Sequence, residues 1–340
     1  MTRYLITGGM GFIGSNFIRY MLHNHPDARI VNLDKLTYAG NPENLKDIVK
    51  DKRYRARYRF IKGDVCDKKI VDKAIQGSDV VVNFAAETHV DRSIYDAGDF
   101  IKTDVFGAFV LFEAAKRHKI GKFVQISTDE VYGHILKGSF KETTPLNPRN
   151  PYSASKAGAD RLAYSYHETY DLPVVITRSS NNFGPYQYPE KLIPLFVTNL
   201  MEGKKVPLYG KGKNVRDWIY VLDNCEGIDI VIRKGKLGEA YNIGGGNELQ
   251  NVAITKMILE LMGKDASWIE RVKDRPGHDL RYSLDCRKVG RLGWRPQSRF
   301  KEALERTVKW YCNNMAWWKP IKMGEFRKYY KKQYIGRNGK

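Results

Sequence analysis

The first half of the chain alternates short apolar runs with longer segments whose apolar residues recur at helical spacing. Short runs rich in Val and Ile predict buried strands, and the spaced segments predict amphipathic helices. Strands are expected at residues 4–6, 29–33, 59–61, 80–84, 123–126 and 174–176, with helices that include 12–23 and 152–170. This alternation predicts an α/β fold in which helices cover both faces of a doubly wound parallel sheet.

The pattern changes after about residue 180, where Pro and Gly separate shorter pieces such as 183–186 and 206–210. We expect residues 1–180 to form the domain with the parallel sheet, and residues 181–340 to form mainly a smaller, mixed α/β domain. Segments near 215–245 are expected to return to the first domain, because strands near 219 and 241 could extend its sheet.

Composition narrows the class of protein. Of the 340 residues, 42% are hydrophobic, which is typical of a globular protein. No apolar run approaches the ~20 residues of a membrane span, and the first residues lack the pattern of a signal peptide. The four cysteines are too widely separated for a paired zinc or disulfide pattern: Cys66, Cys225, Cys286 and Cys312. A cytoplasmic enzyme without a metal is the simplest interpretation.

The net charge of +20 leaves more than one interpretation open. A strong basic excess is typical of proteins that bind nucleic acid or an anionic surface. Here Lys and Arg are spread along the chain, with local density at 50–59 and 326–340, which favours a solvated surface. A basic protein also suits an anionic substrate such as a nucleoside diphosphate.

A glycine-rich turn follows the first predicted strand directly. Gly8, Gly11 and Gly14 flank Phe12 and Ile13, and the turn opens the first predicted helix. This context indicates a Rossmann-type dinucleotide site, because the glycines permit a tight turn, close approach of a pyrophosphate and close helix–strand packing. The helix N-terminus then offers the phosphates free N–H groups and the positive end of its dipole.

Asp34 lies 20 residues after Gly14, at the end of the second predicted strand. A carboxylate there hydrogen-bonds a ribose diol and repels a 2′-phosphate, which favours NAD over NADP. Lys35 follows it and weakens that preference slightly. The ends of the next two strands are placed to border the adenine and its ribose, through Asp64, Val65, Phe84, Ala85 and Ala86.

Tyr152 and Lys156 stand four positions apart in a predicted helix, so both lie on one face. A tyrosine with its unperturbed pKa of about 10 is a poor base at neutral pH. We expect the nearby ammonium to lower that pKa, so that Tyr152 takes a proton from a sugar hydroxyl while a nicotinamide accepts the hydride. The spacing alone would also fit an amphipathic helix surface, and the glycine turn upstream favours the catalytic interpretation.

With these features the chain resembles the extended short-chain dehydrogenases. Within that family the segment 127–133, Ser-Thr-Asp-Glu-Val-Tyr-Gly, is informative because it should reach the nicotinamide. Epimerases usually have small residues at the positions of Asp129 and Glu130, whereas GDP-mannose dehydratases and glucuronate decarboxylases usually keep the glutamate but replace the aspartate with serine. The Thr-Asp-Glu triplet resembles the dTDP-glucose 4,6-dehydratases.

This resemblance covers residues 2 to about 335. Matching blocks stand at 34–41, 85–93, 180–186, 189–194, 216–218 and 274–279. Thr88 stands where the family more often has serine, a change that keeps a hydroxyl group. Asp104 stands where asparagine is usual.

The resemblance implies a reaction and a role for each reactive side chain. Tyr152, with Lys156 and Thr128, would serve the oxidation of the glucose C4 by NAD⁺. Glu130 would then remove the C5 proton, and a protonated Asp129 would donate to the departing C6 hydroxyl before hydride returns to C6. Two neighbouring carboxyl groups can hold different protonation states when their environments differ. The product would be dTDP-4-keto-6-deoxyglucose, in deoxysugar biosynthesis of the dTDP-rhamnose type.

The resemblance also carries over binding residues. Those for NAD are Gly8, Gly11, Phe12, Ile13, Gly14, Asp34, Lys35, Leu36, Thr37, Asp64, Val65, Phe84, Ala85, Ala86, Thr88, Thr103, Tyr152, Lys156 and Asn181. Those for the nucleotide sugar are Thr88, Thr128, Asn182, Lys191, Leu192, Pro207, Leu208, Tyr209, Arg216, Asn251, Asp274, Arg275, Gly277 and His278. The basic residues among them complement a diphosphate.

Three other interpretations compete. Asp129 argues against an epimerase or decarboxylase of the same family, and the full set of reactive side chains argues against a noncatalytic NAD(H) sensor. A nucleic-acid binder would need a contiguous basic stripe with aromatic platforms, whereas the densest basic runs are peripheral. We therefore expect dTDP-glucose as substrate, neither nucleic acid nor membrane as partner, and a homodimer through helices near 100–118 and 152–170.

Overall fold

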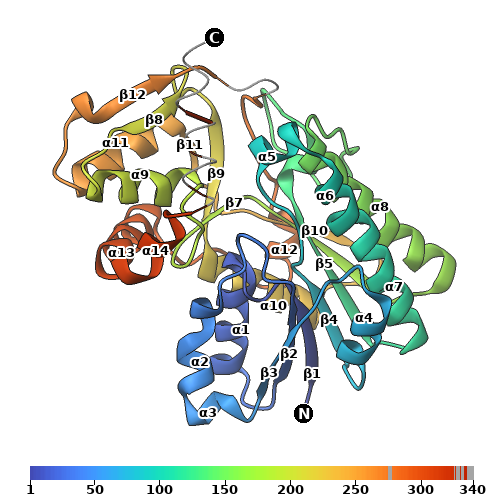
Figure 1. Cartoon of the computed structure of the whole chain (residues 1–340). Helices are drawn as coiled ribbons and strands as arrows, with labels where there is room; N and C mark the ends of the chain where they lie inside the picture. The colour runs from blue at the N-terminus through green and yellow to red at the C-terminus, as the bar shows by residue number, and fades with distance from the viewer. Residues whose placement is uncertain (275–277, 325, 327–329, 331–332, 335–340) are drawn as a thin grey trace.

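Seven parallel strands form the larger sheet in the computed structural model of the protein (Figure 1). They are β1 (Arg3–Thr7), β2 (Arg29–Asp34), β3 (Tyr58–Lys62), β4 (Val80–Asn83), β5 (Lys122–Thr128), β6 (Val174–Ser179) and β10 (Ala240–Ile243). Their order is β10-β6-β5-β4-β1-β2-β3, so the chain runs outward in both directions from the pair β1 and β4. This confirms the predicted doubly wound parallel sheet. The structure describes residues 1–274, 278–324, 326, 330 and 333–334.

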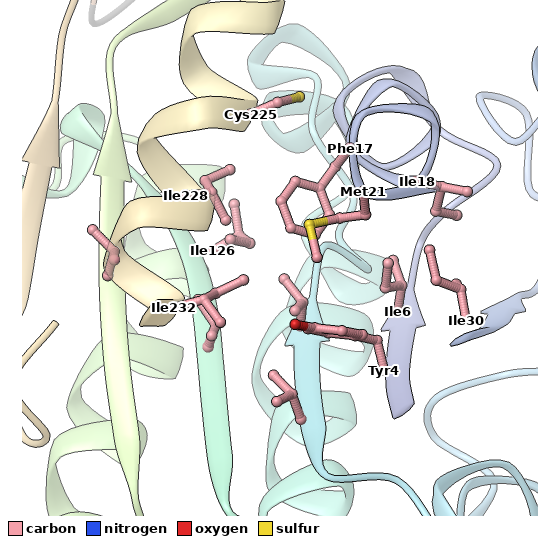
Figure 2. Packing of buried hydrophobic residues seen from close by; sticks show 14 of the residues in the cluster. Tyr4, Ile6, Phe17, Ile18, Met21, Ile30, Ile126, Cys225, Ile228 and Ile232 are labelled. Atoms are coloured by element: carbon pink, nitrogen blue, oxygen red, sulfur yellow. The ribbon is translucent and has the colours of Figure 1, made fainter. Parts of the chain in front are cut away.

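Helices cover both faces of this sheet. One face carries α1 (Phe12–Asn24), α10 (Val221–Lys234) and α12 (Arg287–Gly290), and the other carries α4 (Lys68–Ile75), α7 (Ala108–Arg117) and α8 (Pro151–Tyr170). Because side chains alternate along a strand, Tyr4 and Ile6 of β1 face the first set of helices and Leu5 faces the second. Figure 2 shows part of the first cluster, including Phe17, Met21, Ile126, Ile228 and Ile232.

A second core holds the smaller, mixed α/β lobe together. Its strands are β7 (Asn181–Phe183), β8 (Val206–Tyr209), β9 (Val215–Tyr220), β11 (Glu248–Gln250) and β12 (Ile269–Val272). Its helices are α9 (Leu192–Met201), α11 (Asn251–Leu261), α13 (Phe300–Asn313) and α14 (Met315–Ile321). In Figure 1 this lobe lies beside the carboxyl ends of the parallel strands.

The strand near residue 219 departs from the expectation. β10 joins the larger sheet beside β6, but β9 pairs with β7 and β11 in a separate three-stranded sheet, so the prediction for β9 is wrong. The reason lies in its alternating side chains. Trp218 and Tyr220 pack into the core of the smaller lobe, whereas Ile219 packs into the core beneath α1 and α10. β9 therefore lies at the junction between the two cores.

Shorter elements lie in the loops that follow the parallel strands and, in one case, between α11 and β12 of the smaller lobe. They are α2 (Lys46–Lys50), α3 (Lys52–Arg55), α5 (Val90–Tyr95), α6 (Gly98–Phe100), a π-helix at Ile101–Gly107 and 3₁₀ helices at Pro42–Leu45, Asp129–Tyr132 and Ala266–Trp268. Among the residues that the structure describes, no helix is long and apolar enough to cross a membrane.

Candidate active site

One cavity lies beyond the carboxyl ends of β1 to β6, where the crevice of a doubly wound sheet is expected. Its walls come from the loops after these strands, from α8 and from the segment before α9. The cavity brings together these predicted residues: Gly8, Gly11, Phe12, Ile13, Gly14, Asp34, Lys35, Thr37, Asp64, Val65, Phe84, Ala85, Ala86, Thr88, Thr103, Thr128, Asp129, Glu130, Tyr152, Lys156, Asn181, Asn182 and Lys191.

The glycine turn has the close approaches that its sequence suggests. Gly8 has a φ of +67°, and a Cβ added there would lie 2.6 Å from the backbone nitrogen of Ala85. A Cβ on Gly14 would lie 2.4 Å from the carbonyl oxygen of Gly8. A Cβ on Gly11 would meet only that same oxygen within 4 Å, at 3.2 Å, so Gly11 borders open space in the cavity. The turn therefore leaves open space beside Gly11 in which part of a bound molecule could lie.

Asp34 is tied to this turn as well as facing the cavity. Its Oδ2 accepts a hydrogen bond from the Met10 N–H, and its Oδ1 accepts one from the Leu36 N–H, both at 2.8 Å. Leu36 does not line the cavity, and its backbone has a φ of +59°. Burial raises the pKa of Asp34, and the two N–H groups act in the opposite direction. Lys35 forms an ion pair with Asp64 at 2.8 Å.

Local sequence explains why α8 starts where it does. The Asn150 side chain accepts a hydrogen bond from the Ser153 N–H in a reciprocal cap, and Pro151 occupies the first turn, where its missing N–H costs nothing. Tyr152 and Lys156 are then buried on the face toward β5. The Lys156 ammonium donates a hydrogen bond to the Ile126 carbonyl at 2.7 Å.

The Thr-Asp-Glu triplet forms the end of β5 and the start of a 3₁₀ helix. Thr128 caps that helix, because its hydroxyl oxygen accepts from the Glu130 N–H at 3.3 Å, and its hydroxyl also donates to Asp129 Oδ1 at 3.1 Å. Asp129 is 2% exposed, and its Oδ2 has no hydrogen-bond partner. Burial raises the pKa of Asp129 well above its usual range, and the charges of Glu130 and Asp217 raise it further.

We expected Lys156 to lower the pKa of Tyr152, but the protein without a bound cofactor does not show this lowering. Burial raises the pKa of the Tyr152 phenol well above 10, and the charges of Glu130 and Asp104 raise it further, whereas Thr128 acts in the opposite direction. The prediction of a lowered pKa is therefore wrong for this state. Its physical reason is that desolvation and nearby carboxylates dominate, while the Lys156 ammonium donates its hydrogen bond to a carbonyl group of β5.

The predicted nucleotide-binding residues divide into two sets. Asn181, Asn182 and Lys191 line the cavity, and Lys191 donates to the Thr88 carbonyl at 2.8 Å. The side-chain oxygens of Asn181 and Asn182 have no hydrogen-bond partner. The residues outside the cavity wall are Leu192, Pro207, Leu208, Tyr209, Arg216, Asn251, Asp274 and His278. Arg275 and Gly277 lie outside the described residues.

Several residues of the outer set have defined positions in the smaller lobe. Arg216 is buried, donates to the carbonyl groups of Val215 and Asp279, and lowers the pKa of Asp129 through its charge. His278 Nδ1 lies 2.6 Å from Asp274 Oδ1, and its ring meets that of Tyr209 edge to face. Leu208 is buried in the lobe.

Sequence reasoning missed two acidic residues of the cavity wall. Glu87 lies in the loop after β4, and burial raises its pKa to about 7, with contributions from Asp104 and Asp99. Glu190 accepts hydrogen bonds from Arg92 and from Tyr38, both at 3.1 Å. Each missed residue directly precedes a predicted one, Thr88 or Lys191, and lies in a block that matches the family, 85–93 or 189–194, which was the signal that could have found it. Among the described residues, no group of three or more His, Cys, Asp or Glu side chains could hold a metal ion.

Comparison with known proteins decides between the sister enzymes. The family model described as GDP-mannose 4,6 dehydratase matches residues 5–307. The dTDP-glucose 4,6-dehydratase of Streptomyces niveus is 51% identical over 325 residues, which cover 94% of this chain and 96% of that protein. The chain belongs to the dTDP-glucose 4,6-dehydratase family.

Two further proteins are similar to this chain over most of its length. The crystal structure of DesIV, a dTDP-glucose 4,6-dehydratase from Streptomyces venezuelae with NAD and TYD bound, is 51% identical with a TM-score of 0.92, covering 94% of this chain and 100% of that one. The low-salt glycan biosynthesis protein Agl12 of Haloferax volcanii is 53% identical over 91% of this chain and 98% of that protein.

Proposed function

We propose that this protein catalyses the NAD⁺-dependent dehydration of dTDP-glucose to dTDP-4-keto-6-deoxyglucose, a step of deoxysugar biosynthesis. The observation that carries the proposal is the pair of unlike carboxyl groups in one cavity. Asp129 is buried with an oxygen that has no partner, and Glu130 follows it beside Tyr152 and Lys156. Family resemblance links that aspartate to dTDP-glucose rather than to GDP-mannose.

The cavity fits NAD. Gly11 leaves room beside the N-terminus of α1, where N–H groups and the helix dipole favour a pyrophosphate. Asp34 presents a carboxylate at the end of β2 for a ribose diol, and Val65, Phe84 and Ala85 offer apolar surface nearby. When bound, NAD⁺ supplies the oxidant for C4, the reductant for C6 in its reduced form, and a positive charge beside the sugar.

Oxidation of C4 is assigned to the residues at the end of β5 and the start of α8. Tyr152 takes the proton of the C4 hydroxyl as that carbon becomes a ketone, and Thr128 holds the C4 oxygen. Lys156 stabilises the phenolate through its charge while its hydrogen bond to Ile126 fixes its position. Since the protein alone raises the pKa of Tyr152, this step depends on positive charge that arrives with the bound cofactor.

Elimination of water is assigned to the two carboxyl groups. The C4 ketone makes the C5 proton acidic, and Glu130 removes it. Asp129, kept protonated by burial, donates its proton to the C6 hydroxyl, which leaves as water. Reduction at C6 and return of the proton from Glu130 to C5 complete the product. Tyr152 and Asp129 then return to their starting states by exchanging one proton each with solvent.

The smaller lobe is proposed to bind the nucleotide. Lys191, Arg216 and Arg275 supply positive charge for the diphosphate, with His278 beside Tyr209. The unpartnered oxygens of Asn182 and Asn251 are available as acceptors. The division between a cofactor-binding part, residues 1–180 with later returning segments, and a nucleotide-sugar-binding part, 181–340, rests on these assignments.

We also propose an oligomeric state and a cellular compartment for the protein. We infer a homodimer through the surface of the π-helix, α7 and α8, where Ile101, Phe106 and Tyr164 are exposed. A sedimentation mass of one chain would contradict it. The four cysteines are free, which is typical of the reducing cytoplasm.

Incubation with dTDP-glucose, UDP-glucose and GDP-mannose tests the activity. We expect dTDP-glucose to lose the mass of water and gain a keto group without added reductant, with UDP-glucose a weaker substrate. Turnover of another nucleotide sugar with none of dTDP-glucose would move the protein to a sister activity.

A further inference from the structure

Asp104 is a buried carboxyl group beside the reacting helix that the proposed steps leave unused. It stands in the π-helix Ile101–Gly107 and is 2% exposed. Its Oδ1 accepts the Glu87 N–H at 2.9 Å, and its Oδ2 accepts the Ser155 hydroxyl at 2.7 Å. Asp104 therefore ties the loop after β4 to the turn of α8 that lies between Tyr152 and Lys156. Local π-helical turns are frequent at functional sites.

Charged groups surround Asp104 on each neighbouring element. On α8, Lys156 lowers the pKa of Asp104, but burial outweighs it and the pKa rises to about 6. In return, the charge of Asp104 raises the pKa of Tyr152 and that of Glu87. The other charged groups acting on Tyr152 or Glu87 are Glu130, Asp129, Asp99, Arg92 and Lys35.

An asparagine at this position would keep the same contacts. Its oxygen would accept the Glu87 N–H, and its amide would donate to Ser155 Oγ. The Ser155 hydroxyl has a second acceptor available, the Tyr152 carbonyl at 2.8 Å, to which it would then donate. The hydrogen bonds therefore do not require a carboxylate, and what the carboxylate adds is a buried negative charge that interacts with the charge of Lys156.

We propose that Asp104 is a positioning residue whose negative charge offsets that of Lys156 and so moves the oxidation step carried by Tyr152 to higher pH than a neutral amide would allow. The inference rests on the proposed function, in which Tyr152 takes the C4 hydroxyl proton. Both charges are buried, so solvent and salt screen them little. Removing one such charge is expected to move the pKa of Tyr152 down by about 1 unit.

The first test compares pH profiles of kcat for the wild type and Asp104→Asn with dTDP-glucose. We expect the acid limb of the profile to move to lower pH by about 1 unit, with KM little changed. Ser155→Ala is the matched control, because it removes the hydrogen bond and keeps the carboxyl group, although loss of that bond raises the pKa of Asp104. That control should reduce kcat and move the acid limb less than Asp104→Asn does. Coincident wild-type and Asp104→Asn profiles, or the same shift in Ser155→Ala, would overturn the role of the charge.

The second test needs no substrate. Ultraviolet difference titration of the NAD-bound protein follows phenolate formation, and subtraction of the matching Tyr152→Phe protein isolates the Tyr152 signal. Its midpoint should be lower in Asp104→Asn than in the wild type, and equal midpoints would overturn the inference even if the substrate is another nucleotide sugar. Asp104→Ser, also neutral, serves in the same titration should the amide variant not fold.

Discussion

Asp34 Oδ2 accepts a hydrogen bond from the backbone N–H of Met10 at 2.8 Å, so the carboxylate proposed to hold the ribose also holds the glycine turn. The Leu36 N–H binds its other oxygen. Asp34 therefore affects both the shape of the cofactor site and its charge, and a substitution must separate these two effects.

Two substitutions of Asp34 should separate its effect on the amount of bound cofactor from its effect on the choice between NAD and NADP. Asp34→Ala loses both anchors and should release most of the NAD(H) that we expect to copurify with the protein. Asp34→Asn keeps one acceptor and removes the charge, so it should retain some NAD and gain affinity for NADP. Cofactor analysis of denatured protein measures both. NADP(H) in the wild-type supernatant would contradict the role given to Asp34.

Two glycines of the turn offer a matched pair. Gly11→Ala adds a methyl group that meets one oxygen at 3.2 Å, so the fold should tolerate it while NAD binds at least about tenfold more weakly. Gly14→Ala places its methyl group 2.4 Å from the Gly8 carbonyl oxygen, which forces the backbone apart and should cost about 1–3 kcal/mol of unfolding free energy. Thermal unfolding and NAD titration of both variants test the distinction. Equal loss of stability in the two would refute it.

Local patterns predicted the elements that carry the site. Buried parallel strands are continuous apolar runs, and the glycine turn and the Tyr152–Lys156 spacing are both short-range features, so each could be located from adjacent residues. The same sequence could not place β9, because its alternating side chains serve two different cores.

The pKa shifts of the site residues could not be predicted from local sequence patterns. Lys156 is four residues from Tyr152, but its hydrogen bond goes to Ile126, and the carboxylates that raise the pKa of Tyr152 come from other segments. Glu190 is buried and Glu87 is half-buried, and both are single acidic residues in loops, where no periodicity marks a position beside the cavity. These features depend on which segments fold together.

Glu87 should make stability depend on pH. Its pKa is raised to about 7 in the folded protein, above the ~4.3 of an unfolded glutamate, so the folded state binds more protons between those values. Its contribution to the free energy of unfolding is fully present below about pH 4 and is lost as pH rises through 7. Glu87→Gln should therefore flatten the fall in Tm between pH 5 and 8. Parallel Tm curves for the variant and the wild type would rule this out.

A buried ion pair supports the segment that carries the reactive carboxyl groups. Arg178 Nε donates to Asp160 Oδ2 at 2.8 Å, and its Nη1 donates to the Tyr132 hydroxyl at 2.8 Å. Asp160→Ala leaves the guanidinium buried without its partner and should cost about 3–5 kcal/mol in denaturant unfolding. Asp160→Leu combined with Arg178→Met removes both charges and should cost clearly less. If the double variant is as unstable as the single one, packing rather than charge explains the loss.

The division of labour between oxidation and elimination gives the sharpest test of the mechanism. Tyr152→Phe should block every step, because C4 is never oxidised. Glu130→Gln removes the proposed C5 base and leaves Tyr152 and Thr128 in place, so it should still reduce bound NAD⁺ on mixing with dTDP-glucose and hold the NADH absorbance. It should show little exchange of the C5 hydrogen with deuterated solvent.

Asp129→Asn completes this comparison, because it keeps the shape of the buried acid and removes the proton that the leaving hydroxyl needs. It should allow oxidation and C5 exchange but slow water loss by about 10²–10⁴-fold, the usual cost of losing one general acid or base. Stopped-flow absorbance and mass spectrometry of the sugar follow the two stages separately. If Glu130→Gln forms no NADH while its cofactor remains bound, or exchanges C5 at the wild-type rate, the base has been assigned to the wrong residue.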